Sequence, residues 1–275
     1  MSRGAILITG CSSGIGLASA RTLKARGWRV LATARKPGDI ARLEDEEGVE
    51  AIALELSDPP SVAACAEEAL KRTGGKLDAL FNNAAFGQVG AVEDLTADLL
   101  RRQLETNVIG THALTRPILA AMRANGCGRI VQCSSVLGLV SGPYRGAYCA
   151  SKFALEALSD ALRLELRDTT IRVSIIEPGP IHSRFVASAL ANFKATIDMD
   201  GSPHRATYLA RLAVMEAGGT TTFKLPPEWV AAKLVHAVES PRPKARYFVT
   251  TPTYLAAVMK RVLPTALLDR FLMGM

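Results

Sequence analysis

The sequence predicts a doubly wound α/β fold, in which seven parallel strands form one sheet with helices on both faces. Three observations predict it. Short aliphatic runs alternate with longer stretches of helical periodicity through most of the 275 residues. The composition is 48% hydrophobic but only 5% aromatic, as expected of strands buried on both faces of a parallel sheet. Glycine and proline stand at the ends of several of these segments.

The first half of the chain contains four expected strands, each a short and mainly aliphatic run, at residues 5–8, 29–33, 50–54 and 77–81. A helix expected over residues 15–25 ends at Gly27, because glycine readily closes a helix. A second helix over 59–72 begins at a Pro-Pro pair, because the first turn of a helix has no partner for the N–H that proline lacks.

The second half continues the alternation. Long helices are expected over residues 97–124 and 147–166, and strands over 129–132, 172–176 and 247–249. The pattern changes after Pro178-Gly179-Pro180, where residues 184–223 are helical but irregular. A further helix follows at 226–238, and residues 252–275 read as a helical tail. Because no linker or repeat interrupts the chain, we expect one domain over residues 1–275.

The charges and cysteines exclude several classes of protein. The net charge is +7, which suits either a mildly basic surface or attraction to a phosphate-bearing cofactor. The basic residues are scattered, which argues against a nucleic-acid partner. The five cysteines have no metal-site spacing, so we expect no metal and a reduced, cytoplasmic protein. We also expect no membrane span.

A glycine-rich turn, Thr9-Gly10-Cys11-Ser12-Ser13-Gly14-Ile15-Gly16, lies between the first expected strand and helix. Gly10 permits the tight turn, Gly14 lets the backbone approach a pyrophosphate, and Gly16 lets the helix pack closely on the strand. The start of the helix adds free N–H groups and the positive end of its dipole. Because the turn follows a strand and opens a helix, it predicts a Rossmann-type nucleotide site.

The end of the second expected strand indicates which dinucleotide binds. An acid there would bind the ribose hydroxyls of NAD, whereas an arginine suits the 2′-phosphate of NADP. Arg35 and Lys36 stand at this point with no acid before Asp39, and Ser12 could add a hydroxyl. Both cations could instead be ordinary solvated charges. We expect NADP(H), with NAD(H) as the alternative.

A second set of residues points to catalysis. Tyr148 and Lys152 are four residues apart on one helix face, and Ser135 ends the strand before them. A Tyr-x-x-x-Lys match alone is common. Taken in order with the glycine turn, the sequence resembles the short-chain dehydrogenase/reductase family, in its compact single-domain branch. The further motifs of this resemblance are Asn82-Asn83-Ala84-Ala85, Asn107 in Thr106-Asn107-Val108, and Pro178-Gly179-Pro180.

The match spans residues 4–183, and the tail and the Thr-Ala-Arg strand end also resemble bacterial relatives of retinol and 17β-hydroxysteroid dehydrogenases. This resemblance implies that an alcohol and its ketone or aldehyde are interconverted. Tyr148 would be the proton donor and acceptor, with its pKa lowered by Lys152 and the oxidised cofactor. Ser135 would position the substrate oxygen. Asn107 would hold a water of the proton relay.

The resemblance also implies the cofactor-binding residues, which are Gly10, Ser12, Ser13, Gly14, Ile15, Gly16, Arg35, Glu55, Leu56, Asn83, Ala84, Tyr148, Lys152, Pro178, Ile181 and Ser183. Two positions depart from the family. Ala85 stands where glycine is usual, and Glu55-Leu56 stands where Asp-Val is frequent at the adenine edge. Neither change removes a catalytic group.

The loop 139–145 and the segment 184–223 are expected to shape the substrate site. Their apolar residues, which indicate either a lipophilic pocket or simple core packing, are Leu139, Val140, Tyr144, Phe185, Phe193, Met199, Leu209, Leu212 and Met215. A lipophilic pocket would take a steroid, a retinoid or a fatty carbonyl. The tail carries an apolar stripe near Lys260, Arg261 and Arg270, which could pack on the body or a partner subunit, or lie on a membrane.

Family members are commonly dimers or tetramers, so a homodimer or homotetramer is expected. Two other functions use the same residues. One is an NADP(H)-sensing binding protein without turnover, which the intact catalytic residues disfavour. The other is an epimerase or dehydratase with bound cofactor, and such relatives usually carry a larger C-terminal domain.

Overall fold

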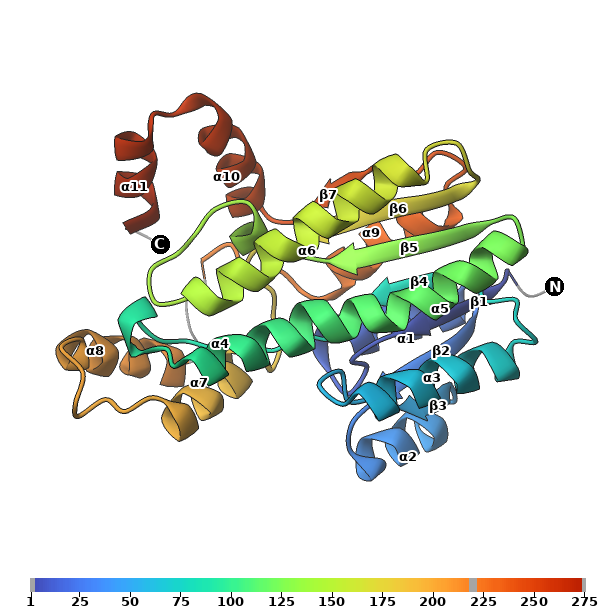
Figure 1. Ribbon diagram of the computed structural model, residues 1–275, viewed down its shortest axis with the longest axis horizontal. Coiled ribbons are helices and arrows are strands. Elements are labelled where there is room, and N and C mark those ends of the chain that lie inside the picture. Colours follow the sequence, from blue (N-terminus) through green and yellow to red (C-terminus); the bar gives the residue numbers. More distant parts are fainter. Residues whose placement is uncertain (1–2, 218–221, 274–275) are drawn as a thin grey trace.

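The computed structural model describes residues 3–217 and 222–273, which form a sheet covered by helices on both faces (Figure 1). Seven parallel strands lie in the order β3-β2-β1-β4-β5-β6-β7. They are β1 (Ala5–Ile8), β2 (Arg29–Ala34), β3 (Glu50–Ala53), β4 (Ala79–Asn82), β5 (Gly128–Cys133), β6 (Ile171–Glu177) and β7 (Arg246–Phe248). The strand order reverses at β1, which pairs with β2 on one side and β4 on the other. The doubly wound, Rossmann-type sheet is therefore confirmed.

The two faces of the sheet bury two separate cores, because successive strand residues point to opposite faces. Ile6 and Ile8 of β1 pack with α1 (Gly14–Ala25), α2 (Pro37–Asp45) and α9 (Glu228–Glu239). Leu7 points to the other face and packs with α3 (Pro59–Arg72) and α5 (Thr111–Ala124). The helix α6 (Gly146–Glu165) lies over the same face, beside β5 and β6 (Figure 1).

The structure differs from the expected helices in two places. The helix α2 was missed, although Pro37 stands in its first turn, where proline is favoured. The uninterrupted helix expected over 97–124 was wrong. The chain forms α4 (Ala97–Leu104), then a π-helical segment (Glu105–Gly110), then α5. A Cβ at Gly110 would lie 1.9 Å from the carbonyl oxygen of Leu56, so this close approach requires glycine.

The segment 184–223 contains α7 (Phe185–Thr196) and α8 (Arg205–Glu216). The glycines at 218–219 lie outside the described residues, as do the last two residues of the tail. The tail contains α10 (Thr251–Val262) and α11 (Thr265–Met273), which project from the body beside the amino-terminal half of α6 (Figure 1). Over the residues that the structure describes, no helix is both long and apolar enough to span a membrane.

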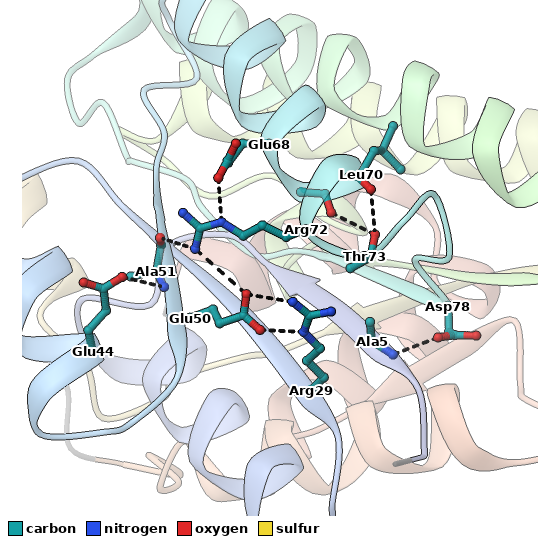
Figure 2. Close-up of polar contacts among 11 residues, drawn as sticks. Ala5, Arg29, Glu44, Glu50, Ala51, Glu68, Leu70, Arg72, Thr73 and Asp78 are labelled. Carbon is teal, nitrogen blue, oxygen red and sulfur yellow. Dashed lines mark hydrogen bonds and ion pairs between the residues drawn. The ribbon is translucent and has the colours of Figure 1, made fainter. Parts of the chain in front are cut away.

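Ion pairs and hydrogen bonds hold the amino-terminal end of the edge strand β3 to its neighbours (Figure 2). Arg29 of β2 donates to the Glu50 carboxylate of β3 at 2.5 and 3.0 Å. Arg72 at the end of α3 donates to Glu68 at 2.7 Å and to the carbonyl of Ala51 at 3.2 Å. These contacts tie the edge strand β3 to β2 and α3, at the end of the sheet opposite to the glycine turn.

Candidate active site

The glycine turn after β1 has the conformation that its residues allow. Gly10 and Gly14 have φ angles of 73° and 57°, in the left-handed region that favours glycine. At Gly16 an added Cβ would lie 2.2 Å from the carbonyl oxygen of Gly10. A side chain there would push α1 away from the turn. Ser12, Ser13 and Ile15 are partly buried around it.

Asn83, which follows β4, braces this turn. Its Nδ2 donates to the carbonyl oxygens of Thr9 at 2.9 Å and Gly10 at 3.3 Å. The backbone N–H groups of Asn83 and Ala84 both donate to the Thr9 hydroxyl. The side chain of Asn83 therefore holds the glycine turn in place, and its contact with a cofactor stays a prediction. Ala85 does not have a positive φ, so its backbone does not demand the usual glycine.

Arg35 lies at the carboxyl end of β2 with 72% of its side chain exposed, and its Nη1 is 3.4 Å from Glu55 Oε2. Ser57 also donates to the Glu55 carboxylate, and together these contacts hold the Glu55 pKa below its usual value despite partial burial. Leu56 is buried in the core on the α3 face. The side chain of Leu56 therefore packs inward, and its expected role at the adenine edge stays a prediction.

One more arginine, Arg42, contacts the glycine turn, although it was not among the expected site residues. Arg42 of α2 donates from Nη2 to the carbonyl oxygen of Ser12 at 2.7 Å. It was missed because α2 itself was missed. The Pro37 helix start was the signal that could have placed Arg42 on a helix beside the turn.

The loop after β6 lies across the glycine turn. A Cβ at Gly14 would lie 3.0 Å from the Cβ of Ser183, so these two expected cofactor residues are close neighbours. The Pro178 carbonyl accepts a hydrogen bond from the backbone N–H of Val136 at 2.8 Å. Ile181 is buried and forms a bridge to Leu225. The structure thus brings together expected cofactor residues from both halves of the chain.

Ser135, Tyr148 and Lys152 come together where β5 ends and α6 begins. A hydrogen bond links the side chains of Ser135 and Tyr148. The Nζ of Lys152 lies 5.7 Å from the centroid of the Tyr148 ring and donates to the Cys133 carbonyl at 2.7 Å. Lys152 is buried, with 3% of its surface exposed, so its side chain has a defined position.

The electrostatics of Tyr148 differ from the expectation. Burial raises the Tyr148 pKa above its usual value, and the Ser135 hydrogen bond and the Arg145 charge only partly oppose this effect. Burial also lowers the pKa of Lys152, against the opposing charge of Glu156. In the chain by itself, Tyr148 is therefore a protonated hydroxyl at neutral pH, which is the state that a proton donor requires.

Asn107 lies in the π-helical segment, a feature often found at functional sites. Both the nitrogen and the oxygen of its side-chain amide make hydrogen bonds within the protein. Nδ2 donates to the Phe86 carbonyl at 3.0 Å and to Ser151 Oγ at 3.1 Å, and Oδ1 accepts from the Phe86 N–H. Ser151 in turn donates to the Tyr148 carbonyl at 2.7 Å. The side chain thus braces the start of α6, and the water-holding role of Asn107 stays a prediction.

The apolar residues expected at the substrate site divide into two groups. Phe193 and Leu212 are buried with Tyr208 in a core beneath α7 and α8, and Val140 is buried in another, so core packing accounts for these three. Phe185 is 36% exposed and lies against Tyr148.

The tail reaches the same region. Leu268, Phe271 and Leu272 of α11 belong to the cluster that contains Val140 and contacts Tyr148.

An open cavity of about 500 Å³ lies between the loop before α6, the start of α8 and the end of α11. Its lining residues are Ala91, Val92, Glu93, Pro143, Tyr144, His204 and Met273. Among the described residues no group of three or more His, Cys, Asp or Glu side chains could hold a metal ion.

Comparison with known proteins identifies similar chains. A model of the short chain dehydrogenase family matches residues 4–193. The uncharacterized oxidoreductase YbbO of Escherichia coli strain K12 is 45% identical over 269 residues, covering 98% of this chain and 94% of that protein. Human 17-beta-hydroxysteroid dehydrogenase type 1 is 35% identical over 278 residues, with 95% and 82% covered. A short chain dehydrogenase/reductase from Burkholderia phymatum in complex with NAD has a TM-score of 0.80 at 26% identity, with 98% and 95% covered.

Proposed function

Because this chain belongs to the short-chain dehydrogenase/reductase family of oxidoreductases, we propose that it uses NADP(H) to interconvert a lipophilic alcohol and its ketone or aldehyde. One observation carries the proposal, namely that a continuous set of contacts connects the glycine turn to Tyr148. Gly14 lies against Ser183, whose Oγ accepts from the Phe185 N–H at 3.3 Å, and the Phe185 ring lies against Tyr148. A dinucleotide on the glycine turn would thus end beside the proton donor.

The residues around the glycine turn fit a dinucleotide. The turn exposes the backbone of Gly10 and Gly14 at the start of α1, where N–H groups and the helix dipole attract a pyrophosphate. Expected contacts with the rest of the cofactor come from Ser12, Ser13, Ile15, Asn83, Ala84, Glu55, Leu56, Pro178, Ile181 and Ser183. When bound, the nicotinamide cofactor supplies or accepts the hydride.

In the direction of carbonyl reduction, Tyr148 gives its proton to the substrate oxygen as negative charge develops there. Ser135 donates a second hydrogen bond to the same oxygen and fixes its position. Lys152 would hold the ribose of a bound cofactor, and its positive charge favours the Tyr148 phenolate that remains. Asn107 braces α6 from behind through Ser151. In the reverse direction the Tyr148 phenolate takes the proton back from the alcohol.

The test of this function is the fall of absorbance at 340 nm when NADPH is mixed with ketosteroids, retinal, aliphatic aldehydes and diketones. We expect turnover by the wild type and a loss of more than about 100-fold in Tyr148→Phe, since general acid catalysis contributes that much. Tyr148→Phe should still bind NADPH. NADPH binding without turnover on any compound would instead support a cofactor-sensing protein.

The preference for NADP(H) over NAD(H) rests on Arg35 and Lys36 at the end of β2. Arg35 is largely exposed, and its long ion pair with Glu55 leaves it free to turn toward a 2′-phosphate. Arg35→Ala should weaken NADPH binding about tenfold and leave NADH binding unchanged. Arg101→Ala is the matched control, because Arg101 is 74% exposed and pairs with Asp98 far from the glycine turn. Equal affinities of the wild type for NADPH and NADH would contradict the assignment.

A lipophilic substrate is supported by the apolar side chains beside Tyr148. Phe185 approaches Tyr148 from α7, while Leu268 and Phe271 of α11 pack in the cluster that contacts it. Apolar walls around a few polar groups are typical of sites for lipophilic molecules. The similarity to human 17-beta-hydroxysteroid dehydrogenase type 1 supports testing steroids first.

We further propose one catalytic domain over the whole chain. A cytoplasmic location is in keeping with five cysteines that form no disulfide.

We propose that the protein forms a homodimer or homotetramer. Ile109 of the π-helical segment and Leu158 and Leu164 of α6 are exposed, at 52%, 45% and 58%. Exposed apolar side chains on long helices suit contact with a second copy. Light scattering should give a mass of two or four chains, and Leu158→Glu with Leu164→Glu should reduce it.

The inner face of the tail packs on the body, since Ala256, Ala257 and Leu272 are buried. The outer face of α10 exposes Tyr254, Leu255, Val258 and Val262, with Arg261 beside them, whereas the Lys260 ammonium lies over the Phe153 ring of α6. Such a face suits a membrane surface with anionic lipids, or a partner subunit. Sedimentation with anionic liposomes distinguishes a membrane surface from a partner subunit. It compares the wild type with the double variant that carries Leu255→Glu and Val258→Glu. Point variants are preferable to truncation, because truncation would uncover the core around Ala256.

A further inference from the structure

A second set of buried charges lies behind the candidate active site. Glu156 follows Lys152 by one turn of α6, and its carboxylate accepts a hydrogen bond from Nη1 of Arg246 on β7. The same Nη1 donates to Glu177 Oε1 at 2.6 Å, at the end of β6. Nη2 of Arg246 donates to Asp160 Oδ2 at 2.5 Å. We call Glu156, Glu177 and Arg246 the carboxylate cluster.

The carboxylate cluster touches the elements that carry the expected catalytic residues. Glu156 shares α6 with Lys152, and Glu177 immediately precedes Pro178. Ser134, next to Ser135, faces Glu156. A Cβ added at Gly138 would lie 2.5 Å from Ser134 Oγ and 3.1 Å from Glu156 Oε1. Ser134 and Glu156 thus enclose a space too small for a methyl group.

The carboxylate cluster holds two acids, Glu156 and Glu177, against one cation, Arg246. Glu177 is fully buried, and burial together with the charge of Glu156 raises its pKa to about 8, so it keeps a proton at neutral pH. Burial raises the pKa of Glu156 above its usual value, and Ser134 and Arg246 oppose this effect by favouring the ionised carboxylate.

Packing alone does not explain this arrangement. Glu177 Oε2 is buried and makes no hydrogen bond to the residues that the structure describes, and Glu156 Oε1 is buried with the Ser134 hydroxyl as its polar neighbour. Buried ion pairs can often be replaced by apolar side chains without loss of stability. A role in the electrostatics of the neighbouring site accounts for carboxylates that are not fully satisfied.

Lys152 is the group that such a role would serve. It is buried, so its charged form is disfavoured, and its hydrogen-bond partner at 2.7 Å is the uncharged carbonyl of Cys133. Cys133 and Glu156 oppose this loss of charge, but burial raises the pKa of the Cys133 thiol to about 11, so Glu156 is the one of the two that can be an anion at neutral pH. Without an anion nearby, a buried lysine tends to become neutral and could not stabilise a phenolate.

We propose that Glu156 is a positioning residue of this enzyme. Anchored by Arg246 and one turn from Lys152 on α6, it keeps Lys152 charged and in place behind Tyr148. The proposal rests on the proposed function of Tyr148 and Lys152. The charged and titratable groups that act on Glu156 and Lys152 come from five elements. They are Lys152 and Asp160 of α6, Cys133 of β5, Glu177 of β6, Arg246 of β7 and Lys260 of α10.

The test compares Glu156→Gln with the wild type over pH 6 to 10, with NADPH and the best carbonyl substrate. We expect kcat to fall about tenfold at pH 7 and KM to change less than about twofold, because substrate binding is not the step that depends on Glu156. The alkaline limb of the kcat profile should move to lower pH by about one unit, because Lys152 loses its neighbouring anion. Glu156→Asp, which keeps the charge, should restore part of kcat and the position of the limb.

Asp160→Asn is the matched control. Asp160 also accepts from Arg246, but it lies two turns from Lys152 along α6. We expect the pH profile of Asp160→Asn to overlay that of the wild type. The proposal is wrong if Glu156→Gln and Asp160→Asn lose kcat equally and the alkaline limb of the kcat profile moves in neither variant. The carboxylate cluster would then be a structural ion pair.

A second measurement does not require turnover. In protein labelled with 13C at the lysine Cε, the Lys152 signal is identified from its absence in Lys152→Met. Its titration midpoint should be lower in Glu156→Gln than in the wild type by about one unit. An unchanged midpoint overturns the positioning role even if the enzyme is active. A lowered midpoint without carbonyl reduction by the wild type would support the coupling and contradict only the proposed function.

Discussion

The aromatic ring of Phe185 lies against the ring of Tyr148, with 5.4 Å between the ring centroids and 58° between the ring planes. The two residues are 37 positions apart in the sequence (185 − 148) and come from α7 and α6. A Cβ at Gly87 would lie 2.8 Å from the Phe185 ring and 3.7 Å from the Tyr148 ring, so both rings lie close to the loop after β4. Phe185 therefore closes one side of the space above the expected proton donor.

Phe185→Ala should raise KM for bulky lipophilic carbonyl substrates about tenfold, because the substrate loses an apolar wall worth about 1–2 kcal/mol. Its effect on kcat should be smaller, since Tyr148 keeps its bond to Ser135. Steady-state kinetics with one large and one small substrate check this. Val214→Ala is the control, because Val214 is exposed on α8, was not expected at the substrate site and should change neither constant. Equal effects on the large and the small substrate would contradict a wall contact.

Gly16→Ala should weaken cofactor binding by more than tenfold and destabilise the fold by about 1–3 kcal/mol, because its methyl group would meet the Gly10 carbonyl oxygen and force α1 outward. Fluorescence titration with NADPH and urea unfolding measure the two effects. The matched control is Gly38→Ala in α2, where an added Cβ meets no atom within 4 Å. If Gly16→Ala binds the cofactor as the wild type does, the close approach at Gly16 is not what shapes the site.

Glu239 at the end of α9 supports stability at neutral pH. Arg26 donates to its carboxylate at 2.8 and 2.6 Å, and Trp28 donates at 3.1 Å, which lowers the Glu239 pKa to about 2. The stability that it contributes is present above the ordinary pKa near 4.5 and is lost as pH falls toward 2. Glu239→Gln should lower the free energy of unfolding by about 1–2 kcal/mol at pH 7. Urea unfolding at pH 7 and 3.5 measures the difference in free energy of unfolding between the wild type and Glu239→Gln. This difference should be smaller at pH 3.5, and an equal difference at both pH values would exclude the linkage.

Glu177 should have the opposite pH dependence. Its pKa is raised from 4.5 to about 8, so the folded state holds a proton that the unfolded state releases between these values. The stability from this group is therefore complete below pH 4.5 and falls as pH rises to 8. Glu177→Gln keeps an oxygen for Arg246 but cannot ionise. Urea unfolding at pH 5, 6, 7 and 8 should show Glu177→Gln gaining stability relative to the wild type as pH rises, whereas Glu239→Gln shows no such trend.

The sequence by itself determined the type and order of most elements, because strands and helices leave periodic signals that depend on neighbouring residues only. It also placed the glycine turn, since Gly10, Gly14 and Gly16 act through local conformation and close packing. The family match placed Ser135, Tyr148 and Lys152, and the structure brings these three together. The π-helical segment at Asn107 left no periodic signal, because one wide turn does not change the apolar pattern enough to be seen.

Only the tertiary structure decided which distant residues share an environment. The meeting of Glu156 with Arg246, and of Glu177 with the same guanidinium, joins residues up to 90 positions apart. Their ionisation depends on burial and on charges from other elements, neither of which is a property of a local sequence window. The same reason applies to Tyr148, whose pKa is raised by a burial that the Tyr-x-x-x-Lys spacing does not reveal. Chemistry that depends on local conformation could be predicted from the sequence, whereas chemistry that depends on the electrostatic environment could be described only from the tertiary structure.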